Sequence, residues 1–451
     1  MREPGPADRV RARFPTDGTA DTDRASGGIY FAPGFRSRLI AYGFSNGNSI
    51  SSPTGYAPVY NWTSAAYPPN FPRAPFIDPS FQNGQAVSSI LPDTSRMPQI
   101  LTWTFSIQRE LKRNLTFEGT YVGSHSTHLI LGGSLSNRNT LDPKYLALGN
   151  LLFQDISSST AVAAGYGAPY AAFTSQSTRT VGQSLRPYPQ YLNVSEEWGP
   201  RGIARFNSLQ LKLTKRYSNG LTLLAFYTWS KNMTNSDTGP IDLGPGEGAV
   251  QNPTNRASEV SVSTDGPPHV FVASGSYELP FGPGKKFLGA NAALGRVVGG
   301  WQLTAYCRYT DGLALAITGG NGISALGYPN IRANYVGGDP YKVTDPRAFD
   351  PARDLYLNSA AFATPSTFAL GNTARVLAWV RGFSGKSESL SLAKRIPIKE
   401  RLKAVVRADA TNPLNFVRWS NPTTSITSSN FGKVTGAAGG RTIQLNATVE
   451  F

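Results

Sequence analysis

The chain has little cysteine, little charge and no long apolar run. Cys307 is the only cysteine among 451 residues, which excludes an intrachain disulfide and a multi-cysteine zinc site. Charged residues make up 16% of the chain, below the roughly 25% of a typical soluble domain. No segment approaches the ~18 consecutive apolar residues that a membrane-spanning helix needs. A disulfide scaffold and a helical membrane protein are therefore excluded.

The N-terminus lacks the apolar stretch of a signal peptide, because residues 1–10 mix charges with prolines. Residues 1–27 as a whole are polar and without periodicity, which predicts a disordered or truncated N-terminal segment. The ordered part is expected to occupy residues 28–451.

Basic residues outnumber acidic ones by 43 to 28, a net charge of +15. They are scattered, and several stand beside short turns, such as Lys112, Lys285 and Lys286. Nucleic-acid binding sites instead gather lysine and arginine into a dense patch. We therefore expect solvated charge next to a membrane and no nucleic-acid partner.

Glycine, proline and aromatic residues are abundant, with 46 Gly, 33 Pro, 23 Phe, 20 Tyr and 7 Trp. These residues favour strands and turns over helices. From Leu101 to Gln108 apolar side chains occupy every second position, which is the period of a half-buried strand. The same alternation recurs along the chain and predicts about ten strands. A short surface helix is expected over 143–153, with Asp142 as its N-cap.

The last eleven residues give the clearest alternation. One face of residues 441–451 is polar, and the chain ends on an aromatic residue. This pattern predicts the closing strand of a transmembrane barrel and a membrane-assembly signal for the barrel-assembly machinery. The signal comprises the apolar residues of the other face: Ile443, Leu445, Ala447, Val449 and Phe451.

Short turns alternate with long loops along the chain. Structureless loops of this length argue against a compact soluble domain, but they are typical of outer-membrane barrels. The predicted fold class is therefore all-β: an antiparallel up-and-down transmembrane β-barrel, partial, with about ten strands of a larger barrel. Its short turns would be periplasmic and its long loops extracellular. The turns lie near 112–114, 218–220, 281–286 and 398–400, and the loops cover 45–98, 125–188, 232–267, 311–387 and 413–440.

Aromatic residues near the strand ends predict a girdle at the membrane interfaces, in contact with outer-membrane lipid and lipopolysaccharide. Its members are Trp103, Tyr121, Tyr227, Trp229, Trp301 and Tyr309.

Four groups of polar residues resemble chemical sites, and each has a simpler interpretation. His125 and His128 have metal-ligand spacing, but they are expected on a loop without a third ligand. Asp265 and His269 lack a nucleophile motif, and the adjacent Glu196 and Glu197 would point to opposite faces of a strand. A calcium site in a Gly-rich loop is less expected than a solvated loop; its oxygen donors would be Asn232, Asn235, Asp237, Asp242 and Glu247. We expect no catalytic residues, no cofactor and no metal, and so no enzyme; a ligand-binding residue is not identifiable.

An ordered set of motifs over about 95–451 resembles the barrel of Oar-like TonB-dependent outer-membrane receptors. The set includes Trp103–Leu111, Tyr121–Ser124, Phe206–Leu211, Lys215–Leu221, Tyr227–Lys231, Tyr277–Gly282, Gly299–Leu303, Arg407–Asn412 and the final strand. The resemblance implies an outer-membrane location and a parent with a signal peptide, a plug and about 22 strands. This chain departs from the pattern by having no plug and by Pro268 before His269, where the family usually has arginine. Either Met1 is a false start or the chain is the C-terminal piece of a longer protein.

The favoured function is the wall and ligand-contacting loops of a receptor that takes up a large solute. The TonB energy complex would act only through the missing plug. A self-contained small barrel acting as a passive pore or anchor is the alternative, and a secreted β-sandwich adhesin is a weaker one.

Overall fold

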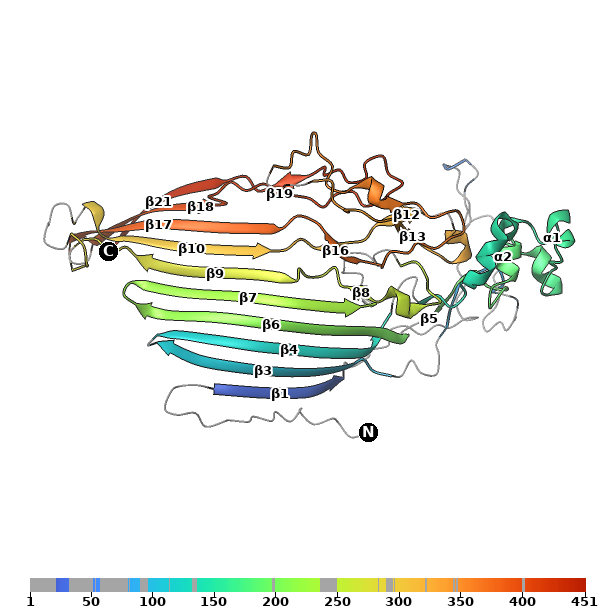
Figure 1. Ribbon diagram of the computed structural model, residues 1–451, viewed down its shortest axis with the longest axis horizontal. Helices are drawn as coiled ribbons and strands as arrows, with labels where there is room; N and C mark the ends of the chain where they lie inside the picture. Colours follow the sequence, from blue (N-terminus) through green and yellow to red (C-terminus); the bar gives the residue numbers. More distant parts are fainter. Residues whose placement is uncertain are drawn as a thin grey trace, which may run out of the picture.

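A single curved sheet and a large assembly of loops make up the computed structural model of the chain (Figure 1). The loops lie at one end of the strands, with the helices α1 and α2 farthest from the sheet. The structure describes residues 22–31, 52, 54–56, 80, 82–89, 96–112, 114–131, 136–196, 199–235, 250–282, 284–288, 295, 297–320, 323–343, 345, 348–399 and 402–451.

The sheet is an antiparallel meander in which strands adjacent in the chain are hydrogen-bonded neighbours. Ten strands follow one another in this order, and the short strand β8 (Ser261–Val262) pairs with the end of the fifth. Within the described residues nothing pairs with the outer edges of the first and last strands, so the sheet is open. In order the ten are β1 (Thr22–Phe31), β3 (Gln99–Lys112), β4 (Leu115–Ile130), β6 (Pro200–Ser218), β7 (Leu221–Thr234), β9 (His269–Glu278), β10 (Trp301–Thr310), β17 (Gly385–Lys399), β18 (Leu402–Thr411) and β21 (Thr442–Glu450).

The first strand starts earlier than the sequence indicates. Residues 22–27, predicted to belong to a disordered segment, are part of β1 and pair with β3. Polar and glycine residues in this stretch conceal the strand, because its pairing with β3 rests on backbone hydrogen bonds rather than on apolar periodicity. Residues 1–21 and 32–44 lie outside the described residues.

The tightest turn has the predicted geometry. Asn219 and Gly220 join β6 to β7 with φ of 52° and 78°. A positive φ at both central residues is the requirement of a type I′ turn, which explains the Asn-Gly pair.

The long connections are folded, which corrects the expectation of structureless loops. We call the described residues of 136–196, 250–262, 311–384 and 412–440 the loop assembly. Its strands and helices are short and follow no sustained periodicity. They are η3 (Pro143–Phe153), α1 (Ser159–Ala163), η4 (Ala171–Ser175), α2 (Val181–Ser184), β5 (Val194–Glu196), which pairs with β2 (Val87–Ser89), η5 (Arg256–Glu259), β8, β11 (Ala314–Leu315), β12 (Thr318–Gly320), η6 (Ser324–Leu326), β13 (Ile331–Arg332), β14 (Asn334–Tyr335), η7 (Ser359–Ala361), β15 (Phe362–Ala363), β16 (Leu377–Arg381), β19 (Arg418–Trp419) and β20 (Ala437–Ala438).

The predicted surface helix is present with its predicted cap. The side chain of Asp142 accepts a hydrogen bond from the Lys144 backbone N–H at 3.0 Å. The segment is a 3-10 helix, and it is kinked where Gly149 adopts a φ of 58°.

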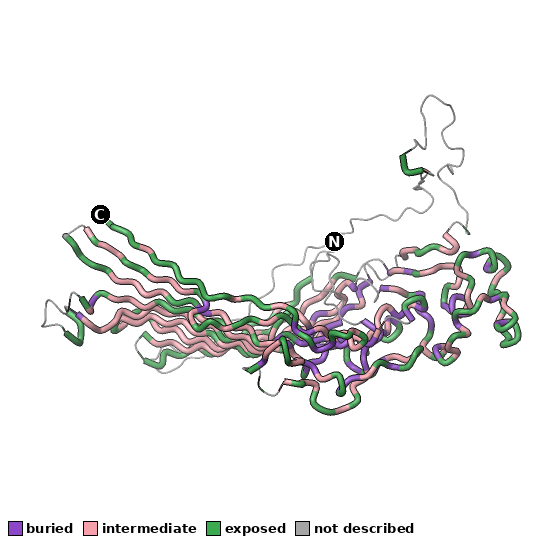
Figure 2. Tube along the Cα trace, turned by 90° about the horizontal axis from the view of Figure 1, so that it is seen from above, coloured by how far each residue is buried: buried purple, intermediate pink, exposed green. Residues whose placement is uncertain are grey.

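The buried hydrophobic residues gather in the loop assembly and not on either face of the sheet (Figure 2). Tyr328 and Leu152 are fully buried in one cluster, Phe173 in a second, and Leu357 in a third that also holds several aromatic rings. Among the described residues, no helix has the length and apolar character to cross a membrane.

A buried polar network holds the loop assembly to the sheet. Arg332 donates to Glu259 over 3.0 Å, with both side chains almost without solvent contact. Arg375 donates to the backbone carbonyls of Glu259 and of Thr234, the last residue of β7. Gln251 bonds to Gly371 and to the Arg332 backbone. Segments more than 100 residues apart are thereby fixed at the end of one strand.

Candidate functional site

One face of the sheet is apolar at most positions, although Lys386 and Glu388 of β17 lie on the same face. Leu221, Tyr277, Leu303, Leu392, Ala408 and Leu445 stand opposite one another in a single row across six strands. A second row contains Gly119, Leu211, Tyr227, Phe271 and Tyr309. Because side chains alternate along each strand, both rows face the same side. The period-two pattern of the sequence predicted a shared face within each strand, although it did not single out Tyr277 or Phe271.

The apolar face is not covered by protein. Leu445 is 78% exposed, Val449 54% and Trp229 55%, and neither Leu211 nor Leu223 is in a buried cluster. A single layer of sheet with this much exposed apolar surface would not be stable in water. Hydrocarbon is the medium that suits it, since a membrane strand presents its apolar side chains to lipid.

The opposite face is mostly polar. Gln108, Glu118 and Lys212 follow one another across three strands, and Lys212 forms an ion pair with Glu118 at 3.6 Å. Phe226 is an apolar residue on this side, and the Lys212 ammonium lies 5.9 Å from its ring centroid. A cation over an aromatic face is a favourable contact, so this face accommodates Phe226 and remains polar.

The six predicted girdle residues all lie on the apolar face. Trp103, Trp229 and Tyr309 lie in the loop-side part of their strands, and Tyr121 and Tyr227 lie nearer the middle of theirs. The Tyr121 hydroxyl donates to Asn207 and the Tyr227 hydroxyl bonds to His269, each at 2.7 Å. Trp301 opens β10 at the other end, with the Lys394 ammonium 5.2 Å from its ring. Aromatic side chains with polar partners suit a membrane interface, and the girdle stays a prediction. The sequence missed Phe271 and Tyr277, which lie on the same face.

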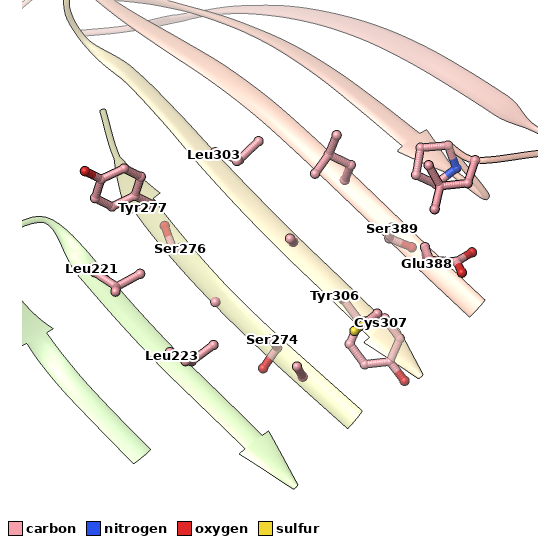
Figure 3. A pocket seen from close by; sticks show the side chains of 16 residues that line it. Leu221, Leu223, Ser274, Ser276, Tyr277, Leu303, Tyr306, Cys307, Glu388 and Ser389 are labelled. Carbon is pink, nitrogen blue, oxygen red and sulfur yellow. The ribbon is translucent and has the colours of Figure 1, made fainter. Parts of the chain in front are cut away.

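A hollow of about 440 Å³ lies on the apolar face (Figure 3). Leu221, Leu223, Tyr277 and Leu303 line it, and Gly275 leaves its floor open. A Cβ on Gly275 would lie 2.7 Å from the Thr222 carbonyl oxygen, so the close approach of β9 to β7 requires glycine. The lining is mostly apolar, which suits lipid chains, but Glu388 also lines the hollow.

Four of the five predicted membrane-assembly residues lie on β21, and Phe451 directly follows it. Ile443, Leu445, Ala447 and Val449 face the apolar side, and the Phe451 side chain is 98% exposed at the chain end. Pairing to β18 leaves the other edge of β21 open within the described residues.

The candidate metal residues have a different setting from the one expected. β4 extends to Ile130, so His125 and His128 are at the end of a strand and not on a loop. The strand continues because β6 begins at Pro200 and pairs with it, with a register shift between Ser126 and Leu129. No group of three metal-binding side chains occurs within the described part of the chain. For the calcium hypothesis, Asp237, Asp242 and Glu247 lie outside that part, and the Asn235 side chain accepts from the Ile203 N–H.

His269 approaches a different acid from the one considered. Its Nε2 is 3.9 Å from Asp311, and its ring stacks on Trp229. Asp265 instead lines a separate cavity at the loop end. These contacts link strands β7, β9 and β10 at the level of the aromatic residues.

Glu196 is buried at the end of β5 and contacts Arg138, Arg201 and Arg256. Glu197 lies outside the described residues. The three arginines come from segments up to 118 residues apart, and nothing in the local sequence indicates that they meet.

An apolar lipid-facing wall, a polar opposite face and an up-and-down strand order define a transmembrane β-barrel wall. Residues 22–444 match the family model of the outer membrane beta barrel domain, and the chain belongs to this family. The protein is therefore located in the bacterial outer membrane. A secreted β-sandwich does not fit, since no second sheet covers the apolar face within the described residues.

Solved structures of large outer-membrane proteins are similar over much of this chain. The outer membrane transporter YddB from Escherichia coli matches with 10% identity and a TM-score of 0.36, over 82% of this chain and 34% of that one. The ferric-catecholate import receptor Fiu from E. coli K12 matches with 8% identity and a TM-score of 0.36, over 95% and 33%. The FrpB iron transporter from Neisseria meningitidis matches with 10% identity and a TM-score of 0.32, over 81% and 32%. No curated protein matches. The chain spans about a third of the length of these structures.

Proposed function

We propose that this chain forms part of the barrel wall and the extracellular loops of an Oar-like TonB-dependent receptor that takes up a large solute. The observation that carries the proposal is the asymmetry of the two ends of the sheet. One end has tight turns, and the other has a loop assembly with its own core. Ordered loops on a rigid wall are the usual location of binding residues.

The ordered motifs described above support the Oar-like subtype. In such a receptor the residues from β1 to β21 are the C-terminal portion of the barrel. The plug and its contact with the TonB energy complex belong to a part of the protein beyond this chain. A passive pore has the same wall but needs no packed loop assembly, so the folded loops favour a receptor.

Epitope insertion tests the orientation with a matched pair of sites. Gly165 in the loop assembly and Gly284 in a short turn both have positive φ and open space around them. An epitope at Gly165 should be labelled on intact cells, and one at Gly284 only after permeabilisation. The opposite labelling would overturn the proposal.

The choice between a receptor and a passive pore is tested separately from the orientation. An in-frame plug and signal sequence upstream of Met1 would support the receptor. Steady ion conductance through the purified chain in planar bilayers, with no plug encoded upstream, would support the passive pore instead.

Phe451 tests the predicted assembly signal. Phe451→Ser should lower the amount of protein in the outer membrane several-fold, while refolding into lipid vesicles stays unchanged, because the signal acts through the barrel-assembly machinery. Thr448→Ala changes the opposite face of the same strand and is the control. Equal losses for both variants would contradict the role of Phe451.

A further inference from the structure

A buried acid lies near the loop end of the apolar hollow. Glu388 is 5% exposed, lines the hollow and is opposite Cys307 in the pairing of β17 with β10. The Tyr309 hydroxyl is close enough to interact with it, but neither carboxylate oxygen has a hydrogen bond of normal geometry to a described residue. Since an ionised carboxylate offers about four acceptor positions, Glu388 retains unused hydrogen-bonding capacity.

An ionisable side chain on a lipid-facing surface carries a cost in stability, and such residues usually mark a functional site. A purely structural acid would have a basic partner in the wall. Lys386 precedes Glu388 by two residues on the same face, but its ammonium lies over the Phe416 ring, 4.4 Å from the centroid. Among the described residues no ion pair joins Lys386 to Glu388. The wall thus presents an acid and a base that do not pair with each other.

Lys386 lies at the level where lipid head groups are expected. Lys394, eight residues further along β17, is its counterpart at the turn end, and its ammonium lies over the Trp301 ring. Roughly 27 Å of strand separates the two lysines, and a tilt of about 40° reduces this to roughly 20 Å of height. Because lysine side chains reach outward from such positions, the two ammonium groups approach the borders of a hydrocarbon band about 25 Å tall. Glu388 then lies just inside the border at the loop end.

The hollow has a shape that suits one lipid chain. It extends along β10 from Leu303, near the turns, to the position of Glu388, near the loops, with a volume of about 440 Å³ (Figure 3). Pro413 and Leu414 border its loop end, because the Asn412 N–H before them donates to the Glu388 backbone carbonyl at 2.8 Å. An apolar chain in this hollow would therefore have its polar head beside Glu388.

We propose that this face binds one lipopolysaccharide molecule through its lipid A part. An acyl chain fills the hollow, and Glu388, after a turn of its side chain, accepts a hydrogen bond from the amide N–H or hydroxyl at the head of that chain. Lys386 contacts a phosphate of the sugar, about 7 Å farther out along the strand. The inference rests on the proposed receptor orientation, because lipopolysaccharide occupies the outer leaflet of the membrane.

The Glu388 carboxylate discriminates between the two classes of lipid in this membrane. A glycerophospholipid has ester oxygens at the head of its chains, and these only accept hydrogen bonds. Lipid A has amide N–H and hydroxyl groups at that depth, and these donate. Because an ionised carboxylate is an acceptor only, it matches lipid A. A hydrogen bond to a charged acceptor is also roughly twice as strong as one between neutral groups.

Native mass spectrometry of the detergent-purified full chain tests the site, with lipid A and phosphatidylethanolamine as the two probes. The wild type should retain one lipid A, and should retain phosphatidylethanolamine several-fold less at the same concentration. Glu388→Leu and Lys386→Gln should each lower the retention of lipid A several-fold, because each removes a charge-assisted contact. Neither substitution should change the retention of phosphatidylethanolamine.

Glu118→Leu is the matched control for Glu388→Leu, since Glu118 lies on the polar face of β4 and pairs with Lys212 there. It should leave lipid A retention unchanged. Urea unfolding in lipid vesicles separates binding from a merely structural role. Glu388→Leu removes an acid from the lipid-facing side, so the wall should be at least as stable as the wild type, whereas a structural acid predicts a less stable wall. If Glu388→Leu does not refold, Lys386→Gln alone decides the outcome.

Three outcomes would overturn the site: equal retention of both lipids by the wild type, wild-type retention of lipid A by folded Glu388→Leu or Lys386→Gln, or an equal loss in Glu118→Leu. Stronger retention of phosphatidylethanolamine than of lipid A would assign the hollow to a glycerophospholipid and reject the proposed ligand. The measurement does not depend on export or orientation. Failure here with correct epitope labelling removes only the lipid A site, and selective retention of lipid A with reversed labelling removes only the proposed orientation.

Discussion

The sheet and the loop assembly place their apolar side chains in different media. In the sheet, Leu445 and Val449 have no protein covering them. In the loop assembly, Leu357 and Phe173 have no solvent contact at all. The sheet thus depends on lipid for its apolar face, while the loops build a core of the kind found in soluble proteins.

Because of this difference, the sheet and the loop assembly are expected to contribute different properties to the protein. The wall can be made from a repeated pattern, because lipid accepts any apolar side chain of suitable length. The loop assembly requires particular partners, since close packing and buried charges tolerate few replacements. Specific recognition is therefore expected from the loops, and the wall supplies a rigid support.

The largest difference in stability between the loop assembly and the sheet is expected when the buried Arg332–Glu259 ion pair is broken. Arg332→Met leaves the buried Glu259 carboxylate without its charged partner, at a cost of about 3–5 kcal/mol. Limited proteolysis should then cleave the loop assembly, while heat-modifiable gel migration of the barrel wall persists. Arg353→Met is the control, because the Arg353–Asp350 pair is exposed and is worth only about 0–1 kcal/mol. Loss of the wall together with the loops would show that the two regions are not separable.

The second largest effect is expected from a substitution that creates a cavity in the core of the loop assembly. Leu357→Ala should destabilise the loop assembly by about 2–5 kcal/mol, since Leu357 is fully buried among aromatic rings. Val162→Ala, at a side chain that is 61% exposed, should change stability by less than about 0.5 kcal/mol. Hydrogen exchange of the loop amides in detergent measures both. Similar exchange in the two variants would contradict a dry loop core.

The third prediction compares adjacent residues on the two faces of β6. Leu211→Arg puts a charge on the lipid side and should destabilise the wall, by at most the roughly 2–4 kcal/mol that such a charge costs at the bilayer midplane. Gln210→Arg is on the polar side and should cost little. Urea unfolding in lipid vesicles, followed by gel migration, gives the two values. Equal costs would mean that the apolar face does not contact hydrocarbon.

Local patterns predicted the sheet well, and its strand order followed from the alternation of short turns and long loops. The β6–β7 hairpin is an example: period-two residues flank an Asn-Gly turn that needs positive φ, and all of this is contained within 35 residues. The ends of several strands differed: β1 starts at Thr22, β4 extends to Ile130, β7 extends to Thr234 and β17 starts at Gly385. Polar strand ends have no apolar periodicity, so the sequence gives no signal for them.

The loop assembly and the arginine cluster had no such local signal. Glu259 and Arg375 look like solvated loop charges in the sequence, yet they are buried together over a separation of 116 residues. Glu196 is likewise buried against the partly exposed Arg256, which lies 60 residues further along the chain. Such contacts depend on how distant loops pack, which periodicity does not encode.

The smallest effect concerns pH and is confined to the loops. A hydrogen bond from the Lys144 backbone N–H lowers the pKa of Asp142, and one from Arg179 lowers the pKa of Asp155. A lowered pKa in the folded state means that each carboxylate stabilises the fold above its unfolded pKa of about 3.9. That contribution is lost as the pH falls through the lower folded pKa. Acidification should therefore loosen η3 and α1 slightly before it affects the sheet.

Asp142→Asn combined with Asp155→Asn isolates this effect, because asparagine keeps the capping geometry but does not titrate. Hydrogen exchange of both proteins at matched pH cancels the intrinsic change in exchange rate. The wild type should lose protection in η3 and α1 below about pH 4, and the double variant should be less protected at neutral pH with little further loss. An equal pH response in both proteins would assign the loosening to other groups. A response in β6 or β7 of the same size would mean that the wall and the loops share one stability after all.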